Sequence, residues 1–268
     1  MIRVICTLLI LSGCSSETPK PIPKPIVAAP AEADTVVVDV DPVINIPLPD
    51  FSSIRDVQER KHLFFTFIYE NIKPINQSIL NDRERLITLN NKTKLNDDEI
   101  EWLSELAYNY RVISEKDNDK TKKQIMDELL VKVDVIPPAL VLAQAASESG
   151  WGTSRFAKEA NNYFGIWCWK KSCGIRPLRR QKNRYHRVRL FPEAKDSILY
   201  YTKLLNNKSS YSKLREIRAK LRKDGKPIVG EALLPGILLY SERGEAYTDE
   251  IAQLIRHNKL EEKYPAVL

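Results

Sequence analysis

One glutamate in the chain lies in a setting that suits acid catalysis. Glu148 stands within residues 147–152, Ser-Glu-Ser-Gly-Trp-Gly. A carboxyl group is the usual general acid for cutting a glycosidic bond. Sugar rings commonly lie on aromatic faces, and Trp151, Trp167 and Trp169 all fall in this part of the chain. Glu148 is therefore a candidate acid, and the alternative is that it forms the solvated end of a helix.

A predicted helix positions this glutamate. Pro137-Pro138 starts the helix, where missing N–H groups cost nothing, and the small residues of 139–147 allow close packing. Glu148 then falls at its carboxyl end, where Gly150 can end the helix. The helix dipole is negative there, so the setting disfavours ionisation and helps to keep an acid protonated. Gln144 lies one turn earlier on the same face, and we expect it to orient the carboxyl group.

The segment 164–190 is predicted to form a β-hairpin or an irregular lobe. Cys168 and Cys173 lie close together in its sequence, and a disulfide between them would pin one turn. A two-ligand metal site is the alternative, but only His186 lies near enough in sequence to assist it. We therefore favour the disulfide, and we expect neither a metal nor a cofactor.

Helices are predicted on both sides of this lobe. The apolar residues of 51–133 recur at three- and four-residue spacing, and residues 96–99 supply the cap and first-turn acids of one helix. Further helices are expected in the C-terminal part, over 193–205, 211–221, 229–240 and 246–259. The sequence thus predicts a mainly α protein in which a helical N-terminal region, 51–133, precedes a domain at 134–268 that carries a small β-hairpin lobe.

The N-terminus is typical of an exported protein. Arg3 precedes an apolar run over 4–11, and small residues then lead to Cys14, a layout too short for a membrane span. Residues 11–14, Leu-Ser-Gly-Cys, also resemble a bacterial lipobox, in which the cysteine is lipidated and becomes the first mature residue. We expect a lipoprotein signal peptide at 1–13 and lipidation of Cys14. The alternatives are an ordinary signal peptide or a core strand.

The segment 14–50 is predicted to be a tether. It holds eight of the sixteen prolines, a composition that builds no core and favours extended chain. At roughly 3 Å per residue it would reach on the order of 100 Å. No Asp follows Cys14 directly, which favours sorting to the outer membrane, so we expect a lipid anchor in the cell envelope, on the periplasmic face of that membrane.

The net charge of the chain indicates only the sign of its partner's charge. Lys and Arg number 42 against 35 for Asp and Glu, a net charge of +7 that implies an acidic partner or surface. Nucleic acid, anionic lipid and an anionic cell wall all fit this charge. Export removes most of the case for nucleic acid, and we expect a monomer.

Several blocks of sequence, in order, resemble the family 73 glycoside hydrolases, which are peptidoglycan N-acetylglucosaminidases. Residues 143–152 and 162–166 carry this resemblance. Three further segments resemble the Bax-type bacterial branch of this family. They are residues 136–138, the segment from Trp167-Cys168 to Cys173-Gly174, and residues 240–247. The resemblance spans roughly residues 55–262. It implies a lysozyme-like, mainly α fold with a small β-lobe over a groove.

The resemblance also assigns roles to residues. Glu148 matches the catalytic acid of the family, and Tyr247 matches a tyrosine at the cleavage site, although Tyr247 could simply be packing. The sugar subsites would be shaped by Trp151 and by Tyr163, Phe164 and Trp167, with the alternative that Phe164 and Ile166 belong to the core. The expected substrate is the peptidoglycan glycan strand.

The second catalytic group is the open question. Standard mechanisms need a second carboxylate, yet no Asp or Glu occurs between Glu159 and Glu193, and Arg187 stands where one would be sought. Either Glu193 or Glu242 reaches the site, or the N-acetyl group of the substrate assists. We favour substrate assistance, with Tyr247 holding the acetamido group.

The lobe is heavily basic, and two interpretations stay open for its charge. It is either a solvated loop or a positive wall that faces the carboxylates of peptidoglycan stem peptides. The basic residues are Lys170, Lys171, Arg176, Arg179, Arg180, Lys182, Arg184, Arg187 and Arg189.

Two other functions compete with an endo-β-N-acetylglucosaminidase. A lytic transglycosylase also uses a lone Glu on a lysozyme-like fold and needs no second carboxylate. An inactive wall-binding lipoprotein would use the tether and the basic lobe for attachment only. The chemical structure of the products distinguishes a lytic transglycosylase from the hydrolase. Comparison of wild type with a Glu148→Gln variant distinguishes an inactive wall-binding protein from an enzyme.

Overall fold

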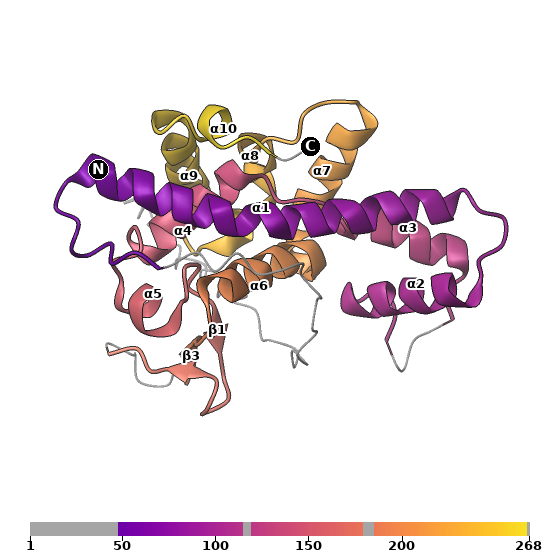
Figure 1. Cartoon of the computed structure of the whole chain (residues 1–268), viewed down its shortest axis with the longest axis horizontal. Coiled ribbons are helices and arrows are strands. Elements are labelled where there is room, and N and C mark those ends of the chain that lie inside the picture. The colour runs from indigo at the N-terminus through magenta and orange to yellow at the C-terminus, as the bar shows by residue number, and fades with distance from the viewer. Residues whose placement is uncertain (1–47, 115–118, 179–184, 267–268) are drawn as a thin grey trace, which may run out of the picture.

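The computed structural model describes residues 48–114, 119–178 and 185–266. Within them the protein is mainly helical, with one small antiparallel sheet (Figure 1). The predicted mainly α class is thus confirmed. The predicted signal peptide, Cys14 and the greater part of the tether lie outside the described residues. None of the described helices is long and apolar enough to cross a membrane.

The N-terminal region is dominated by one long helix, α1 (Val57–Asn90). The helix continues through Pro74 without a break. Asp56 caps its first turn by accepting a hydrogen bond from the backbone N–H of Glu59. Helix α1 crosses the molecule and packs against α3 (Lys122–Lys132), α4 (Pro138–Ser149) and α6 (Ala194–Asn207) (Figure 1). A single apolar core therefore runs from the N-terminal region into the rest of the protein.

The two short helices beside α1 begin at capping boxes. Asn96 caps α2 (Asp97–Asn109), with Glu99 completing the reciprocal pair, as the acidic start of this helix predicted. Thr121 and Gln124 form the same arrangement at the start of α3. These caps satisfy backbone donors that would otherwise have no partner, so both helices begin where the sequence places polar residues.

Helix α4 lies at the centre of the fold. Residues Ala139 to Ala146 are all buried, because short side chains let neighbouring helices approach closely. Helix α4 contacts α1, α8 (Gly230–Leu233), α9 (Glu245–His257) and α10 (Leu260–Lys263). The helix that carries Glu148 is thus surrounded on most sides and held rigidly.

A buried carboxylate precedes α4. Asp134 has an almost fully buried side chain and is surrounded by three arginines from α1 and α7 (Ser212–Lys223). Arg222 forms a two-point contact with it, at 2.7 Å and 3.1 Å, and Arg83 and Arg218 lie 3.6 Å and 3.9 Å from Oδ2. Burial alone would raise the pKa of Asp134, but the Arg222 hydrogen bonds and the three positive charges lower it.

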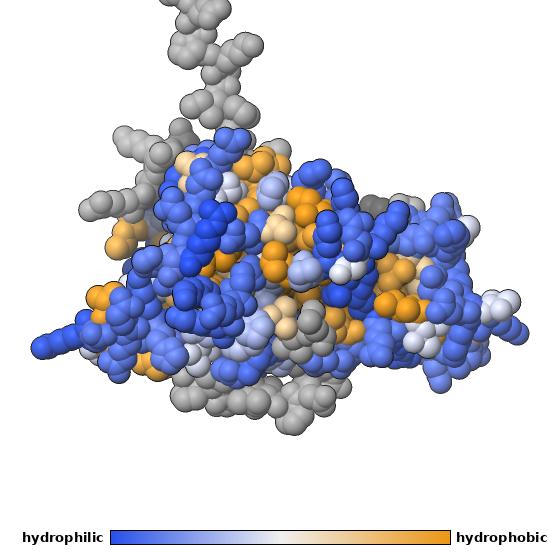
Figure 2. Space-filling view, turned by 90° about the horizontal axis from the view of Figure 1, so that it is seen from above, coloured by the Kyte–Doolittle hydropathy of each residue, from blue (hydrophilic) through white to orange (hydrophobic). Residues whose placement is uncertain are grey.

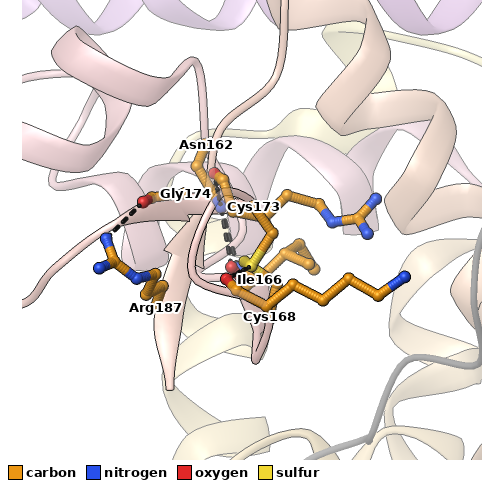
Figure 3. Close-up of a disulfide and its surroundings, with 8 residues drawn as sticks. Asn162, Ile166, Cys168, Cys173, Gly174 and Arg187 are labelled. Atoms are coloured by element: carbon orange, nitrogen blue, oxygen red, sulfur yellow. Dashed lines mark hydrogen bonds between the residues drawn. A yellow bond between two sulfur atoms is a disulfide. The ribbon is translucent and has the colours of Figure 1, made fainter. Parts of the chain in front are cut away.

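The β-lobe contains three strands rather than a simple hairpin. They are β1 (Trp167–Cys168), β2 (Gly174–Ile175) and β3 (Arg187–Arg189), and β3 lies in the middle of the sheet. Val188 pairs with both Trp167 and Ile175. The Cys168–Cys173 disulfide closes the turn that leads from β1 toward β2, so that prediction is confirmed (Figure 3).

Two helical segments differ from the sequence prediction. A short helix, α5 (Arg155–Ala160), follows the Gly-Trp-Gly turn and was not expected. The single helix predicted over 229–240 is instead α8 followed by two short 3-10 turns, η2 (Leu234–Gly236) and η3 (Leu238–Tyr240). Pro235 explains the break, because a proline removes a helix hydrogen bond and crowds the preceding turn.

Candidate active site

Glu148 lies in the last turn of α4, as predicted from the sequence. Gly150 follows in the left-handed conformation, φ 57°, and ends the helix. The Ser149 hydroxyl secures the turn by donating to the Ala145 carbonyl at 2.6 Å and accepting from the Gly152 backbone N–H at 2.9 Å. The Glu148 side chain therefore projects from a helix end whose shape is fixed by its own hydrogen bonds.

A chain of hydrogen bonds leads from the core to the Glu148 carboxyl group. Tyr201, on α6, donates to Gln144 Oε1, and Gln144 Nε2 donates to the Tyr247 hydroxyl at 2.9 Å. The Tyr247 hydroxyl in turn hydrogen-bonds Glu148. Gln144 thus acts on the carboxyl group through Tyr247, whereas the sequence suggested a direct contact. Every donor in the chain has one acceptor, so the hydroxyl hydrogen of Tyr247 is directed at Glu148.

The environment of Glu148 favours its protonated form. Burial raises the pKa of its carboxyl group, while the hydrogen bond from Tyr247 and the positive charge of Arg243 act in the opposite direction. The negative charge of Glu250 adds to the increase, and the net shift is upward. A carboxyl group whose pKa is raised can hold a proton closer to neutral pH, which is what a general acid requires.

Gly165 leaves room for this carboxyl group. Its backbone has φ 63°, and a Cβ atom added there would lie 3.4 Å from Glu148 Oε2. The neighbouring turn is held by Asn162, which exchanges hydrogen bonds with the backbone of Ile166, both at 2.9 Å (Figure 3). Asn162 also donates to the Arg189 carbonyl at 2.8 Å. One buried amide therefore ties the loop facing Glu148 to the small sheet.

Two of the expected sugar-shaping aromatics are buried behind the site. Tyr163 and Phe164 are only 1% and 2% exposed. The Phe164 ring stacks on Tyr201 at 4.1 Å, and its carbonyl accepts a hydrogen bond from Tyr240 at 2.8 Å. Side chains this deeply buried offer no face to a sugar ring, so both residues belong to the core behind Glu148.

The tryptophans of the site lie in different surroundings. Trp151 packs edge-on against Phe64 and Phe65 of α1, with the Lys61 ammonium group over its ring. Trp167 is partly exposed on β1 and stacks on His186, with ring centres 3.8 Å apart. Trp151 therefore connects the turn after Glu148 to α1. Trp167 retains accessible surface at the β-lobe, as does Trp169, which is 42% exposed.

A second acidic residue near Glu148 was missed by the sequence analysis. Glu250 lies one turn after Tyr247 on α9, and its negative charge acts on Glu148. Its Oε1 accepts from the Ser147 hydroxyl at 2.6 Å, and its Oε2 lies 2.7 Å from Arg243. The signal available in the sequence was the three-residue spacing from Tyr247, which places both side chains on one helix face.

One of the second carboxylates proposed from sequence has another role. Glu193 stands at the start of α6, where it takes part in a capping box with Asp196 and pairs with Lys195 at 3.2 Å. Arg187 donates to the Gly174 carbonyl at 3.0 Å and thereby supports the sheet (Figure 3). No group of three or more potential metal ligands occurs among the described residues.

Comparison with known proteins identifies the family of the chain. The glucosaminidase family model, described as mannosyl-glycoprotein endo-beta-N-acetylglucosaminidase, matches residues 123–260, which include α4, the β-lobe and α9. The chain belongs to this family, whose domain is lysozyme-like, so the predicted fold class and resemblance are both confirmed.

A curated relative extends the similarity beyond that domain. The chain is 31% identical over 212 residues to Protein bax of Escherichia coli (strain K12). The aligned part covers 79% of this chain and 74% of that protein. No solved structure matches the chain.

Proposed function

We propose that this protein is an endo-β-N-acetylglucosaminidase that cleaves peptidoglycan glycan strands, with Glu148 as the general acid. The observation that carries the proposal is the half-buried Glu148 carboxyl group, whose pKa is raised and which is oriented by Tyr247. Membership of the glucosaminidase family supports the reaction class and the substrate.

Glu148 donates its proton to the glycosidic oxygen as the bond from that oxygen to the sugar C1 breaks. Tyr247 donates to one carboxyl oxygen, which leaves the O–H of the other free to face the substrate. Once Glu148 has lost its proton, the same hydrogen bond stabilises the carboxylate. As that bond breaks, the acetamido oxygen of the cleaved sugar closes on C1, and in the second step water attacks C1 and opens this ring.

Sugar binding relies on the β-lobe and on the surface around Glu148. Trp167 supplies a partly accessible aromatic face, whereas Tyr163 and Phe164 support this surface from the core. The basic side chains of the lobe, among them Arg176 and Arg187, add positive charge that attracts stem-peptide carboxylates.

A lipid on Cys14 and the proline-rich tether keep the enzyme in the cell envelope. This part of the proposal is supported by the lipobox-like residues 11–14 and by the composition of 14–50. The expected location is the periplasmic face of the outer membrane, from which the tether lets the catalytic domain reach the wall. Radiolabelled palmitate incorporation into wild type, with Cys14→Ala as control, tests the anchor.

The test of the activity is mass analysis of the muropeptides released by the purified protein and by its Glu148→Gln variant. We expect wild type to release fragments with reducing N-acetylglucosamine ends and the variant to release almost none. Fragments with 1,6-anhydro-muramic ends would establish a lytic transglycosylase instead. If neither protein releases any fragment while both bind peptidoglycan, the chain is an inactive wall-binding protein.

A further inference from the structure

Glu250 is held as an ionised carboxylate beside the proposed acid. Both of its oxygens have partners, the Ser147 hydroxyl at 2.6 Å and Arg243 at 2.7 Å. Ser147 directly precedes Glu148, so this contact ties Glu250 to the end of α4 that carries the acid. The hydrogen bond from Ser147 and the pairing with Arg243 lower the pKa of Glu250.

This carboxylate also remains accessible. The Glu250 side chain is 38% exposed, in contrast to the buried Tyr247 one turn earlier. A carboxylate offers about four lone-pair positions, of which Ser147 and Arg243 occupy two, so Glu250 can accept a further hydrogen bond. The Arg243 guanidinium group also lies 5.4 Å from the Tyr247 ring centre, which gathers Arg243, Tyr247 and Glu250 around Glu148.

The two glutamates have opposite electrostatic settings. Glu148 is shielded from water and favours its protonated form, whereas Glu250 is stabilised in its charged form by a hydroxyl and a guanidinium group. A pair of acids whose environments separate their pKa values in this way commonly divides the acid and charge-stabilising roles of a reaction. Among the described residues, Glu250 is also the acidic group whose charge acts on Glu148.

We propose that the Glu250 carboxylate accepts a hydrogen bond from the acetamido N–H of the sugar being cleaved and stabilises the positive charge that develops there. This role rests on the proposed function, because it requires an N-acetylated sugar substrate. It makes Glu250 a catalytic residue that contacts the substrate, with Ser147 and Arg243 as its positioning residues.

The reaction takes place in two steps. The acetamido oxygen uses a lone pair to form a bond to C1, while the bond from C1 to the leaving oxygen breaks and that oxygen takes the proton of Glu148. The resulting oxazolinium ion carries its charge partly on nitrogen, whose N–H points to Glu250. Water then attacks C1, Glu148 takes back a proton, and the C1–acetamido bond returns its electron pair to the acetamido oxygen. The anomeric configuration is retained.

The experiment compares Glu250→Gln with Asp249→Asn, a matched change of charge on an exposed residue of the same helix. Each protein is titrated with the thiazoline analogue of N-acetylglucosamine, which mimics the oxazolinium ion, and its rate on purified peptidoglycan is measured. We expect Glu250→Gln to lose about 100-fold in both thiazoline affinity and kcat, in line with losing one group that stabilises developing charge. Asp249→Asn should match wild type, and melting curves check that both variants fold.

Three outcomes overturn this role. In the first, Glu250→Gln keeps both its thiazoline affinity and its kcat within about threefold of wild type. In the second, Asp249→Asn loses as much as Glu250→Gln. In the third, proton NMR shows that wild type inverts the anomeric centre. Failure of the proposed function gives a different result, which is seen with wild type alone: the protein releases no fragments with reducing N-acetylglucosamine ends. The thiazoline titration reads binding without turnover and so still tests Glu250 in that case.

Discussion

Asp134 and Glu148 lie at opposite ends of α4, and their surroundings are opposite in kind. Asp134 precedes the helix and is surrounded by Arg83, Arg218 and Arg222, which together lower its pKa. Glu148 ends the helix, and burial raises its pKa, while Arg243, whose positive charge acts on it, is paired with Glu250. Both carboxyl groups are substantially buried, so burial alone does not distinguish a structural acid from one proposed to act in catalysis.

The difference lies in how the charge is compensated. Three arginines satisfy Asp134 as an anion, and the cluster joins α1 and α7 to the start of α4. Glu148 instead receives a neutral hydrogen bond from Tyr247 and feels another carboxylate nearby. The negative charge of Asp134 is therefore fully compensated, whereas that of Glu148 is not. Because its charged form is disfavoured, Glu148 keeps a proton that it can donate.

The largest effect is expected from Glu148→Gln, which removes the acid but keeps its shape. We expect kcat on peptidoglycan to fall by about 10³-fold, the contribution typical of a general acid. Stability should not decrease, because the substitution leaves no buried charge without a partner. Fragment release and a melting curve on the same preparation check both statements. If the variant unfolds, Glu148 would be a structural acid like Asp134, and the contrast between the two residues would be wrong.

Asp134→Asn should affect stability rather than catalysis. It leaves three arginines facing one another in the interior, and breaking a buried ion pair from one side typically costs about 3–5 kcal/mol. The free energy of unfolding in urea, compared with wild type, measures this loss. At a temperature where the variant is folded, its kcat should stay within a few-fold of wild type. A large loss of kcat without loss of stability would contradict the structural role.

Tyr247→Phe should have an intermediate effect on catalysis. It removes the hydroxyl that orients Glu148 and leaves Gln144 Nε2 without its acceptor. We expect a loss of about 10- to 100-fold in kcat and about 1–3 kcal/mol in stability, the usual cost of a buried donor without a partner. Steady-state kinetics and urea unfolding test this. Phenylalanine is the suitable substitution because it keeps the shape of the ring, whereas tryptophan would not fit at this buried position.

The smallest effect is the pH dependence of stability, and its sign differs between the two acids. Asp134 has a lowered pKa, so its contribution is present above the unfolded-state pKa and is lost as pH falls through the folded value. Glu148 has a raised pKa, so wild type loses stability as pH rises from the unfolded value through the folded one. Glu148→Gln should therefore be more stable than wild type at neutral pH and equal to it in acid. Urea midpoints across this range measure the difference.

The features set by local sequence were predictable. The helix before Glu148, its end at Gly150 and the disulfide depend on residues close together in the chain, and the structure has all three. The continuous helix α1 was less predictable, since Pro74 and the apolar spacing allowed a break that tertiary packing prevents.

Contacts between distant segments could not be read from the sequence. Glu250 lies more than a hundred residues from Glu148, and its position depends on how α9 packs on α4. Asp134 likewise meets arginines contributed by two other helices. In both cases the residue types were visible in the sequence, but their partners depend on helix packing.

The contact between Phe51 and Gly152 has a mechanical consequence. The Phe51 ring is buried against Phe64 and Phe67, and a Cβ atom on Gly152 would lie only 2.4 Å from it. The described chain thus enters its folded body directly against the turn that follows Glu148. Tension on the residues before Phe51 would therefore act at this contact, on α1 and on the turn after Glu148 alike. A pull that dislodged Phe51 would remove the ring that packs against this turn and so loosen the support of Glu148.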